Sequence, residues 1–248
     1  LIIASSFAKG KTILRNCAIE PEIKDLINFL RKMGCNIKWT GQRTITILGV
    51  QRLKKVKYKI MFDRIEAGTY MIASALTEGN LKITNINPKI IDTEINILKK
   101  VGASIKIKDN ELKIIGKKKI KNIKLKTAPY PGFPTDLQAQ LMVLLCKANG
   151  RSEISETIFE NRFMHAAELN RMGAKINILG NKAFINGNVN FIAAELMATD
   201  LRASVSLILA ALVAKGKSII NRIYHLDRGY EEIEKKLQNV GANIKRIS

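Results

Sequence analysis

The sequence predicts an α/β fold in which a helix–strand–helix–hairpin unit recurs four times and apolar helices are buried behind amphipathic sheets. Three observations support this prediction. Glycines recur at a regular spacing, alternating polar and apolar runs follow them, and three helical segments are apolar on nearly every side. The unit is too long for a solenoid repeat.

Two sets of glycines mark the repeat. Members of one set follow a hydrophobic residue at intervals of 68, 71 and 68 residues, and they are Gly34, Gly102, Gly173 and Gly241. Members of the other set follow an earlier helix in each unit, and they are Gly10, Gly79, Gly150 and Gly216. Helices often end on a left-handed residue, which only glycine adopts without strain, so we expect each of these glycines to close a helix.

Alternating runs predict the strands, because half-buried strands alternate apolar and polar residues. The turns Asp109–Asn110 and Gly180–Asn181 would join two hairpins. The runs are Thr44–Leu48, Ser104–Lys108, Glu111–Ile115, Lys175–Leu179, Ala183–Ile185 and Asn243–Ile247. The helices expected to be buried are Ala67–Thr77, Asp136–Ala148 and Asp200–Ala214.

The stretch Thr127–Gln140 leads into the second buried helix. It holds three of the five prolines of the chain, so its backbone is stiff. We expect Thr135 to be the N-cap and Asp136 to lie in the first turn, where the positive end of the helix dipole favours a carboxylate. Complementing the dipole is the simplest role for Asp136.

Composition indicates a globular protein of 248 residues with 46% apolar residues and a net charge of +21. Such a charge could serve nucleic-acid binding, but the lysines are scattered and no aromatic binding strand stands out, so we expect solvated faces and no nucleic-acid partner. The three cysteines are far apart and form no metal motif, which predicts a reducing compartment and no bound metal. The longest apolar run, Val205–Ala214, is too short to span a bilayer, so we expect a cytoplasmic protein without a membrane partner.

Several motifs resemble those of the enolpyruvyl transferases, and closely those of the UDP-N-acetylglucosamine 1-carboxyvinyltransferases of peptidoglycan synthesis. They extend in order over the whole sequence, and they are Glu20–Glu22, Asp63–Thr69, Ala128–Gln140, Glu156–His165, Met197–Ser204 and Asp227–Glu231. The resemblance implies an inside-out α/β barrel fold in two domains. Residues 1–61 would then be the end of an incomplete first domain, and residues 62–248 would be the second.

The resemblance also implies a reaction without a cofactor. An enolpyruvyl group would move from phosphoenolpyruvate to the 3-hydroxyl of UDP-N-acetylglucosamine, and phosphate would be released. Asp136 matches the general base of the family, and Arg228 matches an arginine that contacts phosphoenolpyruvate. The role would belong to cell wall synthesis, and with it to cell shape, the cell cycle and cell division.

Further substrate-binding residues are implied in the same way. Arg162 and Arg202 match arginines of the cleft, and Ile158 matches a position whose backbone contacts the UDP-sugar. Asp200 resembles a residue tied to closure, although it could equally be a helix N-terminal carboxylate. Glu20 matches an acidic residue of the first domain. His165 and His225 are expected to be satisfied structural histidines without a chemical role.

Some family features do not occur in this sequence, namely an N-terminal Lys-Asn pair and a mobile loop with a reactive cysteine. We therefore expect that an N-terminal part of the enzyme precedes Leu1. Two other hypotheses stay open. The chain could be a truncated and inactive remnant of the enzyme, or a basic nucleic-acid-binding protein whose affinity falls steeply with salt.

Overall fold

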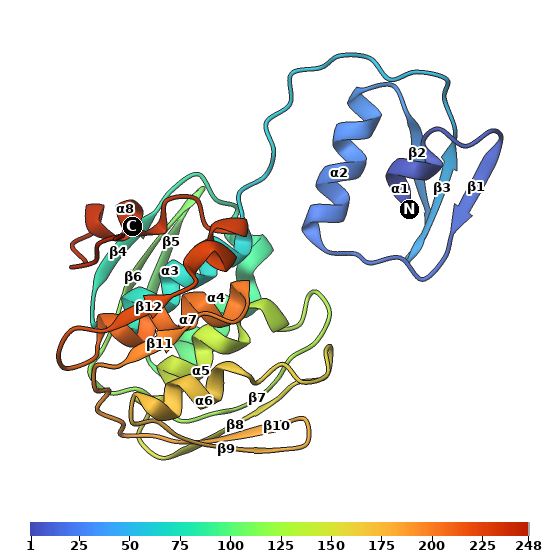
Figure 1. The fold of residues 1–248 in the computed structure, drawn as a ribbon. Coiled ribbons are helices and arrows are strands. Elements are labelled where there is room, and N and C mark those ends of the chain that lie inside the picture. Colours follow the sequence, from blue (N-terminus) through green and yellow to red (C-terminus); the bar gives the residue numbers. More distant parts are fainter. Residues whose placement is uncertain (248) are drawn as a thin grey trace. The chain divides into compact units, whose positions relative to one another are not determined.

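The computed structural model describes residues 1–247 and divides into two compact units (Figure 1). Unit 1 comprises Leu1–Phe62 together with Pro129–Pro131, and unit 2 comprises Asp63–Ala128 and residues 132–247. The interpretation of residues 1–61 as the end of a first family domain stays a prediction.

Unit 1 is a three-stranded antiparallel sheet packed against a helix. Strand β3 is central, and its apolar residues Ile45 and Ile47 are fully buried with Ile27 and Leu30 of the helix α2. The alternation in the sequence thus places every second side chain of β3 in the core. The elements are α1 (Ile2–Ser5), β1 (Lys11–Leu14), α2 (Pro21–Lys32), β2 (Asn36–Gly41) and β3 (Thr44–Leu48).

Unit 2 holds three separate sheets around a set of buried helices. The strand orders are β4-β6-β5, β7-β8-β10-β9 and β11-β12. The strands are β4 (Asn80–Ile83), β5 (Ser104–Lys108), β6 (Glu111–Ile115), β7 (Lys124–Lys126), β8 (Arg151–Ser155), β9 (Lys175–Leu179), β10 (Lys182–Asn186), β11 (Glu195–Met197) and β12 (Ile219–Asn221). In Figure 1, β4–β6 and β7–β10 lie at the outside of this unit, with helices between them.

The helices α3, α5 and α7 form the interior of unit 2, since α3 contacts α5 and α5 contacts α7. All nine residues of α5 are buried, as the apolar sequence predicts, and each large apolar side chain removed from water contributes roughly 1.5–3 kcal/mol. The helices are α3 (Arg64–Leu76), η1 (Pro88–Ile91), α4 (Asp92–Val101), η2 (Thr135–Leu137), α5 (Gln138–Cys146), α6 (His165–Arg171), α7 (Leu201–Leu212), η3 (Ile223–Arg228) and α8 (Ile233–Asn239).

The predicted repeat is confirmed except at two places. The expected glycines are left-handed, with Gly102 at φ 119° as an example, but Gly79 is not, because Glu78 closes α3 at φ 55° instead. Residues 243–247 form no strand, which corrects the prediction for the fourth copy. Arg246 of this run contacts Glu234 at 3.3 Å.

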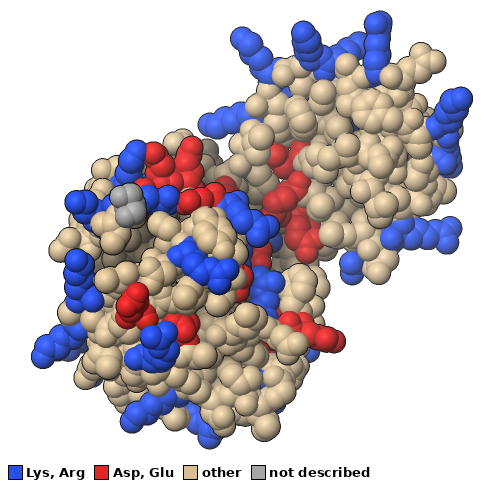
Figure 2. All heavy atoms as spheres, viewed as in Figure 1, with Lys and Arg blue, Asp and Glu red and all other residues tan. Residues whose placement is uncertain are grey.

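Charged side chains are dispersed over the surface. Figure 2 shows Lys and Arg spread over the visible faces of both units, with Asp and Glu among them. This distribution agrees with the interpretation of the lysines as solvated faces.

Candidate active site

The carboxylate of Asp136 lies between two arginines of unit 2. Its Oδ1 accepts a hydrogen bond from Arg162 Nη2 at 2.7 Å, and its Oδ2 accepts one from Arg202 Nη2 at 3.1 Å. The carboxylate is about one third exposed (35%), and the two arginine side chains are 23% and 20% exposed. Hydrogen bonds between ionised partners are the strong ones. The structure therefore brings together three predicted site residues from three different motifs.

The turn η2 determines where Asp136 points. Asp136 lies in the first turn, as predicted, but the prediction of Thr135 as the N-cap is wrong. The residue before η2 is Pro134, which makes no side-chain cap, and the hydroxyl of Thr135 donates to Glu156 Oε2 at 2.8 Å. A buried carboxylate from another segment thus competes successfully for the hydroxyl that would have capped the helix.

A buried polar network holds the backbone at Asp136. Gln140 is fully buried, and its Nε2 donates to the carbonyl oxygen of Asp136 at 3.0 Å and to Thr69 Oγ1 at 3.2 Å. The hydroxyl groups of Thr69 and Tyr230 are 2.8 Å apart. Burial raises the pKa of Tyr230, and the hydrogen bond with Thr69 opposes that rise. Gln140 and Thr69 were not among the predicted site residues, although polar residues inside helices that are otherwise apolar are a usable signal.

Arg202 is placed by the start of α7. Asp200 is the N-cap of this helix, and its Oδ1 accepts hydrogen bonds from the backbone N–H of Arg202 at 2.8 Å and of Ala203 at 2.9 Å. The expected position of Asp200 at the head of a helix is confirmed. Its proposed contact with substrate stays a prediction.

Arg162 is placed by the segment that follows β8. Its guanidinium lies over the ring of Phe159, 4.7 Å from the ring centroid, in an attractive cation–π arrangement. The ring itself is 54% exposed. Ile158 is half-buried, and its backbone N–H donates to Glu156 Oε1 at 2.8 Å.

Arg228 and Glu20 are the two remaining predicted site residues. Arg228 is the exposed last residue of η3, and no ion pair or hydrogen bond joins it to Asp136 within residues 1–247. Glu20 belongs to unit 1 and precedes α2. Its Oε2 is buried and has no hydrogen-bond partner among the described residues.

The expectation of satisfied histidines is wrong in one respect. His165 is buried, but its Nε2 and that of His225 have no hydrogen-bond partner within residues 1–247. The pKa of His165 is lowered to about 4, mainly by burial. The charge of Arg162 also lowers this pKa, whereas the charge of Asp200 raises it. His165 is therefore a neutral side chain next to the charged cluster.

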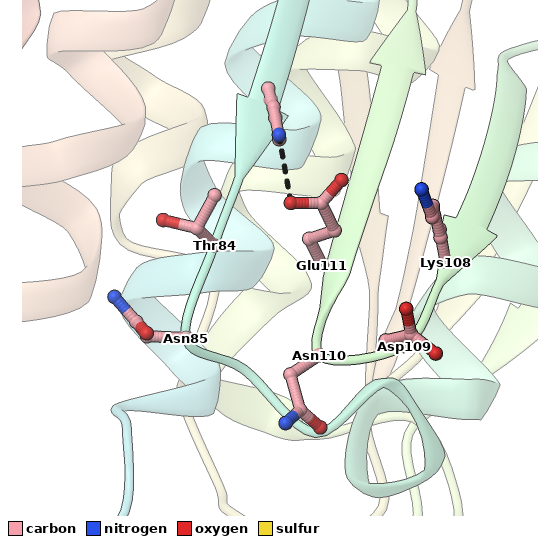
Figure 3. A pocket seen from close by; sticks show the side chains of 7 residues that line it. Thr84, Asn85, Lys108, Asp109, Asn110 and Glu111 are labelled. Carbon is pink, nitrogen blue, oxygen red and sulfur yellow. Dashed lines mark ion pairs between the residues drawn. The ribbon is translucent and has the colours of Figure 1, made fainter.

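A separate hollow lies beside the hairpin of β5 and β6 (Figure 3). Lys82 and Glu111 form an ion pair of 2.8 Å there, and Lys108, Asp109 and Asn110 complete one side. None of the predicted site residues lines it.

Two further properties concern metals and membranes. Within residues 1–247, no three His, Cys, Asp or Glu side chains are grouped so that they could hold a metal ion. In the same part of the chain, no helix has the length and apolar character that crossing a bilayer requires.

The sequence is similar to those of several known proteins. A model of the EPSP synthase (3-phosphoshikimate 1-carboxyvinyltransferase) family matches residues 1–237. A UDP-N-acetylglucosamine 1-carboxyvinyltransferase of Pelagibacter ubique is 76% identical over 248 residues, and one of Geotalea daltonii is 53% identical over 247 residues. Both matches cover all of this chain but only 60% and 59% of those proteins, so the chain spans about three fifths of their length.

Two solved structures share the fold. The enolpyruvyl transferase NikO from Streptomyces tendae superposes with a TM-score of 0.89 at 27% identity, over 98% of this chain and 58% of that one. An EPSP synthase from Acinetobacter baumannii gives a TM-score of 0.76 at 21% identity, over 99% of this chain and 60% of that one, a likeness in fold alone. The predicted inside-out α/β fold class is confirmed.

Proposed function

We propose, since the chain belongs to the EPSP synthase family, that it takes part in transferring the enolpyruvyl group of phosphoenolpyruvate to the 3-hydroxyl of UDP-N-acetylglucosamine. The observation that carries this proposal is the carboxylate of Asp136 held between Arg162 and Arg202. The choice of the sugar nucleotide is supported by the names of the relatives that match the whole chain at 76% and 53% identity.

The charges of the cluster suit these substrates. Phosphoenolpyruvate carries a carboxylate and a phosphate, and planar guanidinium groups can bind either group through two hydrogen bonds. Arg162, Arg202 and the exposed Arg228 are the guanidinium groups that we propose for this task, with Arg228 as the principal contact of phosphoenolpyruvate.

The two ion pairs of Asp136 bear on its role as general base. A base must be within hydrogen-bond reach of the proton that it removes. Each oxygen of Asp136 already accepts one hydrogen bond from an arginine, so a sugar hydroxyl has to approach the second lone pair of one of them. We propose that the anionic groups of phosphoenolpyruvate draw one guanidinium away from Asp136, which makes room for the 3-hydroxyl at that oxygen. The base would then be most accessible to the 3-hydroxyl when the second substrate is bound.

The reaction would proceed by addition and elimination. In the addition, the sugar oxygen forms a bond to C2 of phosphoenolpyruvate and its proton passes to Asp136, while C3 takes up a proton from solvent and the C2–C3 double bond becomes a single bond. In the elimination, C3 returns a proton to solvent, the C2–C3 double bond forms again, and the bond between C2 and the phosphate oxygen breaks. The products are the enolpyruvyl ether of the sugar nucleotide and inorganic phosphate.

Three other residues complete the proposed site. Ile158 would contact the UDP-sugar through its carbonyl group, because its N–H already donates to Glu156. Asp200 would keep Arg202 in place by capping α7 and would also contact substrate. Glu20 of unit 1 would contribute a further acidic group, and its buried Oε2 has no hydrogen-bond partner among the described residues.

The cellular role follows from the proposed product. An enolpyruvyl sugar nucleotide would be a peptidoglycan precursor, so the reaction would serve cell wall synthesis, cell shape and division. We propose the cytoplasm as its location. The three free cysteines support this, since a reducing compartment keeps thiols unpaired.

The test uses the product of the complete reading frame that contains this sequence. Phosphate release would be followed with phosphoenolpyruvate alone, with UDP-N-acetylglucosamine, and with shikimate 3-phosphate as the competing acceptor. We expect release only with the sugar nucleotide, and a product heavier than it by one enolpyruvyl group in mass spectrometry. Release that depends on shikimate 3-phosphate instead, or no release with either acceptor, would contradict the proposal.

A further inference from the structure

Glu156 is a buried carboxylate at the end of β8 whose charge is compensated by hydrogen bonds alone. The residue is 2% exposed, and no Lys, Arg or His of residues 1–247 forms an ion pair with it. An unpaired buried charge is costly, so its hydrogen bonds must hold it firmly.

Four donors converge on this carboxylate. Its Oε1 accepts hydrogen bonds from the N–H of Ile158 at 2.8 Å, the N–H of Phe159 at 3.3 Å and the hydroxyl of Thr127 at 2.9 Å. Its Oε2 accepts one from the hydroxyl of Thr135 at 2.8 Å. The donors come from two segments, residues 127–135 and residues 158–159, which lead along the chain to Asp136 and to Arg162.

The backbone of Glu156 is itself fixed to the sheet. Its N–H donates to the carbonyl of Asn181 at 2.8 Å, and the Asn181 side chain donates to its carbonyl at 3.0 Å. Asn181 lies in the turn between β9 and β10. The backbone of Glu156 is therefore tied to the hairpin of β9 and β10, while its carboxylate binds residues of the two segments.

Each segment carries residues of the proposed site. Thr135 directly precedes Asp136 in η2, and Ile158 and Phe159 lead to Arg162, which stacks on Phe159. We infer that Glu156 is a positioning residue: it sets the place of the base Asp136 through Thr135, and that of the UDP-sugar contact through the amides of Ile158 and Phe159. The inference rests on the proposed function for its substrates, but the hydrogen bonds can be tested without turnover.

Two substitutions of Glu156 distinguish the effect of losing its hydrogen bonds from the effect of losing its negative charge. Glu156→Gln keeps one acceptor oxygen for the two amides and presents an NH₂ group to Thr135, whose hydroxyl can accept as well as donate. We expect this variant to keep kcat and KM within about threefold of the wild type. Glu156→Ala leaves the amides without an acceptor, and we expect KM for UDP-N-acetylglucosamine to rise and kcat to fall, each by about tenfold or more.

A matched control lies on the same strand. Glu153 of β8 is half-buried, pairs with Lys182 at 3.0 Å and forms no ion pair with a residue of either segment. Glu153→Gln makes the same chemical change as Glu156→Gln at a half-buried position away from the site residues, and we expect kinetic constants within about twofold of the wild type.

Amide hydrogen exchange measures directly whether the N–H groups of Ile158 and Phe159 are hydrogen-bonded. In the wild type and in Glu156→Gln, the amides of Ile158 and Phe159 should be protected, whereas in Glu156→Ala they should exchange like an open loop. Unchanged exchange and unchanged KM in a folded Glu156→Ala variant would overturn the inference. A wild type that shows this exchange pattern but does not use UDP-N-acetylglucosamine would overturn the proposed function alone.

A milder variant covers the case in which Glu156→Ala does not fold. Thr135→Val removes a single donor and keeps the volume of the side chain. Because only the Asp136 side of the arrangement is disturbed, kcat should fall by about fivefold while KM for the sugar nucleotide stays within about twofold. An unchanged kcat in Thr135→Val would contradict the inference.

Discussion

Asp136 and Asp200 stand at corresponding places in consecutive repeats, but their carboxylates make different contacts. Asp200 accepts hydrogen bonds from the backbone N–H groups of Arg202 and Ala203 and so caps α7. Asp136 accepts its hydrogen bonds from the side chains of Arg162 and Arg202. The carboxylate of Asp200 therefore caps a helix, whereas the carboxylate of Asp136 pairs with two cations.

The backbone explains the difference. Asp200 and Asp63 both precede their helices in extended conformations, at φ −151° and −76°, from which a side chain reaches the N–H groups two and three residues further on. Asp136 lies one residue inside η2, because Pro134 occupies the extended position before the turn. Its side chain is therefore directed away from its own helix. An aspartate at a helix start is a candidate base only when it does not serve as the cap.

The largest expected effect concerns Asp136 itself. Asp136→Asn keeps the shape of the side chain but removes the base, and general base catalysis typically contributes about 10²- to 10⁴-fold. We expect kcat to fall about 10³-fold while calorimetry gives a Kd for UDP-N-acetylglucosamine within about threefold of the wild type. Unchanged turnover would remove Asp136 from its proposed role.

The two arginines should give the next largest effect. Arg162→Lys and Arg202→Lys keep the charge but lose the planar fork, so we expect kcat/KM for phosphoenolpyruvate to fall about 10- to 100-fold. If the arginines act through Asp136, the effects should not multiply when either change is combined with Asp136→Asn. Arg171→Lys is the matched control, because its pair with Glu168 is on the surface, and its effect should be under about twofold.

Removing the cap at Asp200 should have a moderate effect on stability. Asp200→Ala should lower the free energy of unfolding by about 1 kcal/mol, and Asp200→Asn by much less, because asparagine is also a good cap. Asp63→Ala, at the start of α3, should resemble Asp200→Ala in urea denaturation. If Asp200→Asn keeps its stability but loses turnover, Asp200 contacts substrate as well; unaltered stability in Asp200→Ala would contradict its role as a cap.

The smallest effect should be a pH dependence from His165, which is within electrostatic reach of both Asp200 and Arg162. Burial lowers its pKa from 6.5 in the unfolded chain to about 4 in the folded one. Between these values the unfolded chain binds a proton that the folded chain does not, so the free energy of unfolding falls as the pH is lowered.

Between pH 7 and pH 6 this loss should be less than about 1 kcal/mol in urea denaturation. His165→Asn should reduce the slope. A wild type and a His165→Asn variant with equal slopes would contradict the buried, neutral state of His165.

Much of the fold could be predicted because its signals are local. The alternation of Thr44–Leu48, Ser104–Lys108 and Glu111–Ile115 specifies strands, and β3, β5 and β6 have these bounds. Gly79 shows the limit of such signals, since Glu78 took the left-handed position that was predicted for the glycine. The sequence pattern indicates that a left-handed residue ends the helix, but it does not indicate which of two adjacent residues takes that conformation.

By itself, the sequence determined the repeat and the buried helices, because periodicity is a property of short segments. The candidate site residues came from the resemblance of its motifs to a known family. Only the tertiary structure decided which side chains meet. In the folded chain, Arg162 and Arg202 form ion pairs with Asp136. The hydroxyl of Thr135 donates to Glu156 instead of capping the helix, and Gln140 donates to the backbone carbonyl of Asp136. These partners lie up to 66 residues apart, and a hydrogen bond goes to whichever donor the packing of the helices and sheets brings within reach.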